Sequence, residues 1–173
     1  MIPLAKALGV NANWLATGKG HKSQTRQPVE VDENSDYTAI KRVKFKLSAG
    51  VWGYEVEYLN GHRAPIFFRR DWLADRKFDA DQLFAVEVNG QSMEPSLFSG
   101  DLVVVNAADQ TPTDGDVFAA NFEGELVVKR LVRNGGEWLL SSDNQDKRRF
   151  PDKRCDERTN LIGRIVYKQS ERI

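Results

Sequence analysis

The sequence predicts a mostly β fold, in which short antiparallel strands form one domain. Runs in which apolar and polar residues alternate recur through most of the 173 residues, as expected of strands with one buried face. Turn-forming sequences rich in Asn, Asp, Pro and Gly separate these runs at residues 60–61, 112–115 and 134–136. Many short strands with little helix indicate a compact antiparallel β architecture.

Residues 1–18 differ from the rest of the chain, because Leu4, Leu8 and Leu15 recur at helical spacing. A segment this short cannot bury a core alone, so we expect it to fray, to pack on the larger domain or to join a partner. Residues 19–36 are polar and show no apolar period, which predicts a flexible linker. Residues 37–173 are long enough for one folded domain with its own core.

Two short strands are predicted within residues 43–58, on either side of a break made of small residues. The break contains Ala49 and Gly50, which form the only Ala-Gly dipeptide of the chain. A glycine leaves room for another group to approach the backbone closely, although a simple bend or bulge would explain the break equally well. A tight turn at residues 60–61 and a short helical turn at 68–73 follow. Further strands are predicted at residues 83–88, 102–106, 116–121, 125–133, 138–140 and 161–167, with a charged loop at 142–158.

A serine follows the 83–88 strand at a sharp bend. Asn89 and Gly90 form a turn signal just before Ser92, and Pro95 follows it, so the hydroxyl is expected to project from the strand end. A solvated turn serine is the plain alternative. As a nucleophile, this serine would need a base to accept its proton.

Lysine is a better candidate for that base than histidine. The only two histidines, His21 and His62, lie in the predicted linker and in a hairpin turn, which disfavours a Ser-His-Asp triad. The period of two in the 125–133 strand places Lys129 on the same face as Val127 and Leu131. Burial among apolar neighbours would favour the neutral amine that can act as a base.

Composition excludes several other classes of function. The 25 basic and 25 acidic residues balance, so no global basic excess argues for nucleic-acid binding. The single cysteine, Cys155, cannot form an internal disulfide and is expected to be a surface thiol in a reducing, cytoplasmic compartment. No apolar run reaches the roughly 20 residues that a membrane span needs. No motif calls for a metal or another cofactor.

Three stretches, taken in their order along the chain, resemble the C-terminal domain of LexA-like and phage CI-like repressors, the S24 family of self-cleaving Ser-Lys peptidases. The stretches are Gly90-Gln-Ser-Met-Glu-Pro95, Gly100-Asp-Leu-Val-Val-Val105 and Val128-Lys-Arg130. The separation of Ser92 and Lys129, 129 − 92 = 37 residues, is of the kind that this family uses. The resemblance extends over residues 37–170.

The resemblance implies a LexA- and signal-peptidase-like β fold and assigns roles to five residues. Ser92 would be the nucleophile and Lys129 the base, with backbone N–H groups of Ser92 and Met93 stabilising the oxyanion. The scissile bond would join Ala49 to Gly50, since LexA-like proteins cut themselves at an Ala-Gly bond upstream of the serine. Self-cleavage would relieve repression by a prophage-type or stress-response (SOS) repressor.

The same resemblance implies partners. Residues 1–18 are similar to the last two helices of an Xre-type helix-turn-helix domain, without the DNA-reading helix. Operator DNA would therefore be bound only through a full-length head. A homodimer is expected, with the 161–167 strand as a contributor, and the family suggests that a RecA filament acts as a co-protease.

Three alternatives remain at the level of sequence. The chain could be a headless repressor fragment that acts only as a dimerisation module. It could be a UmuD-like polymerase accessory protein, which the helix-turn-helix remnant disfavours. It could also be a signal-peptidase-like enzyme acting on other chains, which the lack of a membrane anchor disfavours.

Overall fold

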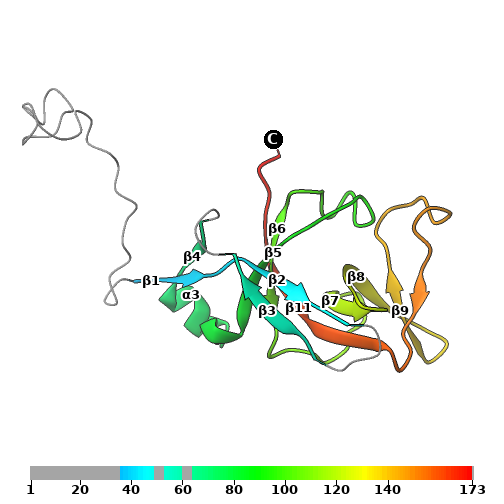
Figure 1. Ribbon diagram of the computed structural model, residues 1–173, viewed down its shortest axis with the longest axis horizontal. Coiled ribbons are helices and arrows are strands. Elements are labelled where there is room, and N and C mark those ends of the chain that lie inside the picture. Colours follow the sequence, from blue (N-terminus) through cyan, green and yellow to red (C-terminus); the bar gives the residue numbers. More distant parts are fainter. Residues whose placement is uncertain (1–35, 49–52, 60–63, 173) are drawn as a thin grey trace, which may run out of the picture. The chain divides into compact units, whose positions relative to one another are not determined.

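The protein is described here by a computed structural model that covers residues 36–48, 53–59 and 64–172, all within one unit, Asp36–Ile173 (Figure 1). These residues are mainly strand, as the sequence predicts. The predicted helical segment 1–18 and the predicted linker up to residue 35 lie outside the described residues. The elements in chain order are β1 (Tyr37–Ile40), β2 (Val43–Lys46), β3 (Glu55–Tyr58), β4 (Ile66–Arg69), α3 (Arg70–Asp75), the 3-10 helix η1 (Ala80–Gln82), β5 (Leu83–Glu87), β6 (Leu102–Asn106), β7 (Val117–Phe122), β8 (Glu125–Asn134), β9 (Glu137–Ser141), β10 (Lys153–Arg154) and β11 (Thr159–Gln169).

Seven strands form the main sheet in the order β10-β9-β8-β7-β11-β6-β5, with every neighbouring pair antiparallel. Two small sheets accompany it, β1 with β4 and β2 with β3. In Figure 1, α3 and β4 lie at one end of the main sheet and β9 lies at the other.

Strand β6 is buried on both faces, which explains its unbroken apolar sequence. Val103 and Val105 face a core shared with the β2–β3 hairpin. Leu102 and Val104 face a second core that is shared with β4 and α3. A third core joins β7, β8 and β9 around Phe118. Strand β6 is thus packed between the first and the second core.

The sheet bends where β11 crosses from β7 to β6. Its register shifts between Leu161 and Gly163 and again between Ile165 and Tyr167, as in β-bulges. At Gly163 the neighbouring backbone is so close that an added Cβ would lie 2.3 Å from the carbonyl oxygen of Asn106. Only glycine allows this close approach.

The predicted strand positions agree well with the observed ones, and β6 has the predicted bounds. The helical turn was predicted two residues too early, because Phe68 still belongs to β4, where it pairs with Thr38. Strands β1 and β10 were not predicted, and the hairpin predicted around residues 60–61 was wrong in its pairing, because β3 pairs with β2 and β4 pairs with β1. Cys155 is half-buried against the third core rather than on the surface, so the surface prediction was wrong. Within the described ranges, no helix is long and apolar enough to cross a membrane.

Replacing Gly163 with alanine should destabilise the domain, because backbone atoms of Asn106 and Ala107 would have to move. We expect a loss of about 1–3 kcal/mol in the free energy of unfolding, the usual range for overpacking. Urea denaturation of the two proteins measures this loss. Equal midpoints would contradict the close approach of β11 to residues 106–107.

Candidate active site

The loop between β5 and β6, here called the serine loop (residues 89–101), carries Ser92. Its base is closed by two backbone hydrogen bonds, from Val88 N–H to the Asp101 carbonyl (2.8 Å) and from Gly100 N–H to the Val88 carbonyl (2.9 Å). Gly100 has a φ of 94°, a conformation that favours glycine. Because β5 and β6 are packed on both faces, this closed base is held rigidly.

Buried side chains fix the serine within its loop. Met93, the next residue, is 2% exposed and packs with Leu97 in the first core. The N–H of Leu97 donates to the Met93 carbonyl at 2.9 Å, which closes a tight turn after the serine. Ser92 itself is half-buried. The sequence therefore holds this serine with an apolar anchor rather than leaving it on a loose turn.

Lys129 lies in the middle of β8, opposite Phe118 of β7, and is only 7% exposed. Its Nζ donates a hydrogen bond of 2.8 Å to Oγ of Ser142, which is also buried. Burial, followed by the positive charges of Lys153 and Lys147, lowers the pKa of Lys129 to about 8, while Asp143 and Asp152 act in the opposite direction. A substantial fraction of this amine is therefore neutral near physiological pH.

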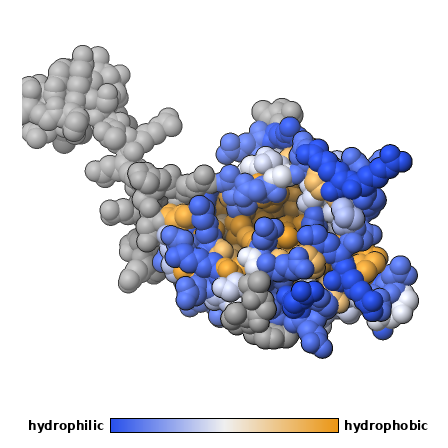
Figure 2. Space-filling view, turned by 45° about the vertical axis from the view of Figure 1, so that its right-hand side comes forward, coloured by the Kyte–Doolittle hydropathy of each residue, from blue (hydrophilic) through white to orange (hydrophobic). Residues whose placement is uncertain are grey.

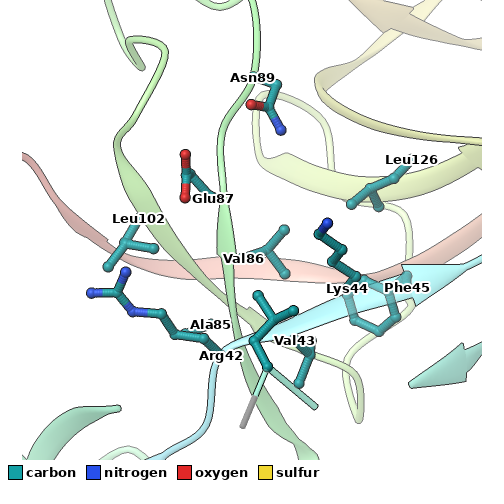
Figure 3. Close-up of a pocket in the computed structure, with 11 residues that line it drawn as sticks. Arg42, Val43, Lys44, Phe45, Ala85, Val86, Glu87, Asn89, Leu102 and Leu126 are labelled. Atoms are coloured by element: carbon teal, nitrogen blue, oxygen red, sulfur yellow. The ribbon is translucent and has the colours of Figure 1, made fainter. Parts of the chain in front are cut away.

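Ser92, Met93 and Lys129 line a single hollow of about 190 Å³. The structure thus brings together the predicted nucleophile, the predicted base and the two residues, Ser92 and Met93, whose backbone N–H groups are predicted to bind the oxyanion. A larger hollow of about 320 Å³ shares Glu87, Asn89 and Leu126 with it. Figure 3 shows this second hollow between residues of β2 on one side and β5 on the other. In Figure 2, hydrophobic residues gather at the centre of one face within a hydrophilic rim.

The segment 142–144, directly after β9, forms hydrogen bonds with the serine loop and with β8, the strand that carries Lys129. Asn144 donates its backbone N–H to the Ser92 carbonyl (3.0 Å) and its side-chain amide to the Gln91 carbonyl (2.8 Å). Asp143 accepts two hydrogen bonds from the Arg130 guanidinium, at 2.8 and 2.6 Å. This segment therefore contacts both halves of the site.

Asp143 is also linked to the serine loop through the side chain of Ser96. Burial alone would raise the pKa of Asp143, but the hydrogen bonds from Arg130 and Ser96 hold that pKa below its usual value. The carboxylate is therefore charged at neutral pH and strengthens its pairing with the guanidinium. From the sequence alone, residues 142–144 were predicted to begin a solvated charged loop, and no local signal marks their contacts with residues 91, 92 and 96.

The C-terminal end of the chain supports the outer side of the serine loop. Lys168 donates from Nζ to the Ser96 carbonyl at 3.0 Å, and the Arg172 guanidinium lies 4.3 Å from the centre of the Phe98 ring. Burial would raise the pKa of Asp101, but the Phe98 N–H, the Ser170 side chain and these two cations hold it below its usual value. The first core, the segment 142–144 and residues 168–172 thus all contact the serine loop.

The predicted scissile residues, Ala49 and Gly50, lie outside the described residues, as do His21 and His62. Ala49 and Gly50 belong to the connection between β2 and β3. The last residue pair before this connection is Lys46 with Glu55. Just before them, the Ser48 carbonyl accepts a hydrogen bond of 3.2 Å from the side chain of Asn121 on β7. Across residues 36–48, 53–59 and 64–172, no cluster of three or more His, Cys, Asp or Glu side chains could hold a metal ion.

Comparison with known proteins gives one family match and several relatives. The family model described as Peptidase S24-like matches residues 39–166. The HTH-type transcriptional regulator PrtR of Pseudomonas aeruginosa is 28% identical over 192 residues, which cover 96% of this chain and 72% of PrtR. The LexA repressor of Dechloromonas aromatica is 39% identical over 64 residues, which cover 36% of this chain and 31% of the repressor. Repressor protein CI of Enterobacteria phage phi80 is 32% identical over 92 residues, which cover 51% and 37%. The matches thus span most of PrtR but only about a third of the LexA and CI repressors.

Proposed function

Because this chain belongs to the peptidase S24-like family, we propose that it contains the self-cleaving regulatory domain of a transcriptional repressor. Ser92 and Lys129 would cut the bond between Ala49 and Gly50 and thereby relieve repression. The observation that carries the proposal is the hollow shared by Ser92 and a buried lysine with a pKa of about 8. The likeness to named repressors over parts of this chain supports the regulatory role.

In the first step, Ser92 Oγ attacks the carbonyl carbon of Ala49 while neutral Lys129 takes the hydroxyl proton. A lysine of ordinary pKa would be neutral in about one molecule in two thousand at pH 7. With a pKa of about 8, the neutral fraction is about one in ten. Burial of the amine thus supplies a usable base without a histidine.

Backbone N–H groups of Ser92 and Met93 would stabilise the oxyanion that forms on the Ala49 carbonyl oxygen. The C–N bond to Gly50 then breaks, and the Lys129 ammonium gives its proton to the departing amine. Water, with its proton taken by Lys129, hydrolyses the ester between Ala49 and Ser92 and frees the serine. Lys129 passes this second proton to Ser92 Oγ as the ester bond breaks, so the lysine and the serine both return to their starting states.

Because the scissile segment belongs to the same chain, the encounter between enzyme and substrate is replaced by a local movement, which lowers the entropic barrier. The pairing of β2 with β3 holds both ends of this segment beside the main domain. A RecA filament would act by favouring the cleavable arrangement of the segment. Operator DNA would be contacted by a complete helix-turn-helix head, of which residues 1–18 are the proposed C-terminal part.

We further propose that the domain forms a homodimer. The predicted contributor, β11, pairs with β7 over Thr159–Arg164 and with β6 over Arg164–Gln169, so among the described residues only Arg164 has strand partners on both edges. Pairing within the sheet therefore does not exclude a backbone contribution from the half of β11 after Arg164, which also carries the exposed Tyr167. Sedimentation at micromolar concentration should give the mass of a dimer, as the twofold symmetry of repressor operators requires. A monomer at all concentrations would contradict this expectation.

The cleavage itself gives the most direct test. Incubation at alkaline pH should yield one fragment that ends at Ala49 and one that begins at Gly50, measured by intact mass. Ser92→Ala should remain whole, because it lacks the nucleophile. Ser99→Ala is a matched control in the same loop, where the exposed hydroxyl accepts a hydrogen bond from Gly90 N–H, and it should be cut like the wild type.

The outcomes separate the possible functions. A cut elsewhere in the chain, with the bond between residues 49 and 50 intact, would overturn the site assignment but keep the peptidase. No cut at any pH, with or without a RecA filament, would overturn the peptidase and leave the dimerisation module as the function.

The cleavage rate should follow the titration of Lys129. Below pH 8 it should rise about tenfold per pH unit, as the neutral amine becomes more abundant, and above that pH it should level off. Lys129→Ala and Lys129→Arg should not cut, since neither variant has a neutral amine at this position. Lys153→Gln should move the midpoint to higher pH, because the positive charge of Lys153 lowers the pKa of Lys129. Cleavage of Lys129→Ala at the wild-type rate would exclude the Ser-Lys mechanism.

A further inference from the structure

The only hydrogen-bond acceptor recorded for the Lys129 amine within the described residues is the hydroxyl of Ser142. The distance between Nζ and Oγ is 2.8 Å, and Ser142 is 3% exposed. A buried serine next to a buried lysine has a simple structural explanation, which is that each satisfies the polar group of the other. The surroundings of Ser142 indicate more than this.

Ser142 is fixed by its neighbours on both sides. Its backbone carbonyl accepts from Lys147 Nζ at 2.6 Å, and Lys147 is itself paired with Asp152 at 2.8 Å. On the other side, Asp143 is held by two hydrogen bonds from Arg130. The Ser142 hydroxyl is therefore attached to a backbone that has little freedom to move.

The segment 142–144 also contacts Ser92, the proposed nucleophile. Asn144, two residues after Ser142, donates its backbone N–H to the carbonyl of Ser92 at 3.0 Å. One short segment thus bonds to the backbone of the serine and to the amine of Lys129. The position of the base relative to the nucleophile depends on this segment.

A neutral amine has two N–H groups and one lone pair, and only the lone pair can accept a proton. A lysine side chain has about 2 kcal/mol of rotamer entropy, so without a fixed partner its lone pair samples many directions. An N–H donated to Ser142 removes most of this freedom. The lone pair is then restricted to directions away from Ser142, into the hollow that Ser92 also lines.

We propose that Ser142 is a positioning residue for cleavage, whose hydroxyl holds the Lys129 amine in the orientation that accepts the Ser92 proton. This inference rests on the proposed function and adds a third side chain to the Ser-Lys pair. Ser142 does not exchange a proton with the substrate.

Three variants test the proposal, with cleavage followed from pH 6 to pH 10 and folding checked by thermal denaturation. Ser142→Ala should lower the plateau rate by about tenfold to a hundredfold, a part of the 10²–10⁴ that positioned proton transfer contributes. Its midpoint should move to lower pH, because the hydroxyl stabilises the charged ammonium. Ser142→Thr keeps a hydroxyl and should retain most of the plateau rate.

Ser141→Ala is the matched control. The Ser141 hydroxyl forms hydrogen bonds with Lys147 and Asp152. On the neighbouring strand β8, Ser141 pairs with Arg130 and not with Lys129. It should keep the wild-type plateau. If Ser142→Ala is folded and cuts itself with the wild-type plateau rate and midpoint pH, the positioning role is overturned. In that case the proposed function would still stand, provided that Ser92→Ala remains uncut.

A measurement without cleavage keeps the two proposals separate. In the uncut Ser92→Ala background, NMR relaxation of the Lys129 Cε reports how freely the amine end moves. Adding Ser142→Cys, which is close in size but a weak acceptor, should lower the order parameter of this carbon. An unchanged order parameter would overturn the positioning role even if the wild-type protein never cut itself.

Discussion

The curvature of the main sheet is the constraint on which the site depends. Three strands separate β5, which leads to Ser92, from β8, which carries Lys129. Four interstrand spacings in a flat sheet would place these strands about 19 Å apart. Both residues nevertheless line one hollow of about 190 Å³, so the sheet must fold back on itself. The two register shifts of β11 and the close contact at Gly163 provide bends in the middle of this arc.

Once the strands are close, a buried lysine amine has to be accommodated. An ammonium ion inside the protein is disfavoured unless it has partners, and a hydroxyl is a weaker partner than a carboxylate. The structure supplies Ser142 as acceptor, while Asp143 is already engaged by Arg130. With Asp143 engaged in this way, its raising effect on the pKa of Lys129 stays smaller than the lowering effects of burial, Lys153 and Lys147. Stability and the proposed reactivity are therefore opposed at Lys129, because a closer carboxylate would favour the fold but would keep the amine charged and unable to act as the proposed base.

Local patterns were enough to predict most strands, but not the contacts between them. Strand β6 has the predicted bounds because its apolar run ends at clear turn signals. Strand β1 was missed, since Tyr37–Ile40 shows no alternation and is held by its pairing with β4. Ser92 and Lys129 were found through their order along the chain. Ser142 and Asn144 were not found, because no local pattern reports contacts between distant residues. The partner of Ser142 lies 13 residues away along the chain, and those of Asn144 lie 52 and 53 residues away.

The pH at which the lysine becomes neutral can be adjusted without changing the reacting groups. Lys147 and Lys153 lower the pKa of Lys129, whereas Asp143 and Asp152 raise it. Three of these four residues, all except Asp143, lie between residues 147 and 153, beyond the segment that bonds to the serine loop. Each unit of pKa changes the neutral fraction about tenfold when the pH is below the pKa. Under the proposed mechanism, substitutions in this stretch would therefore set how readily the domain cleaves itself at a given pH, while the proposed nucleophile, the proposed base and their spacing stay the same.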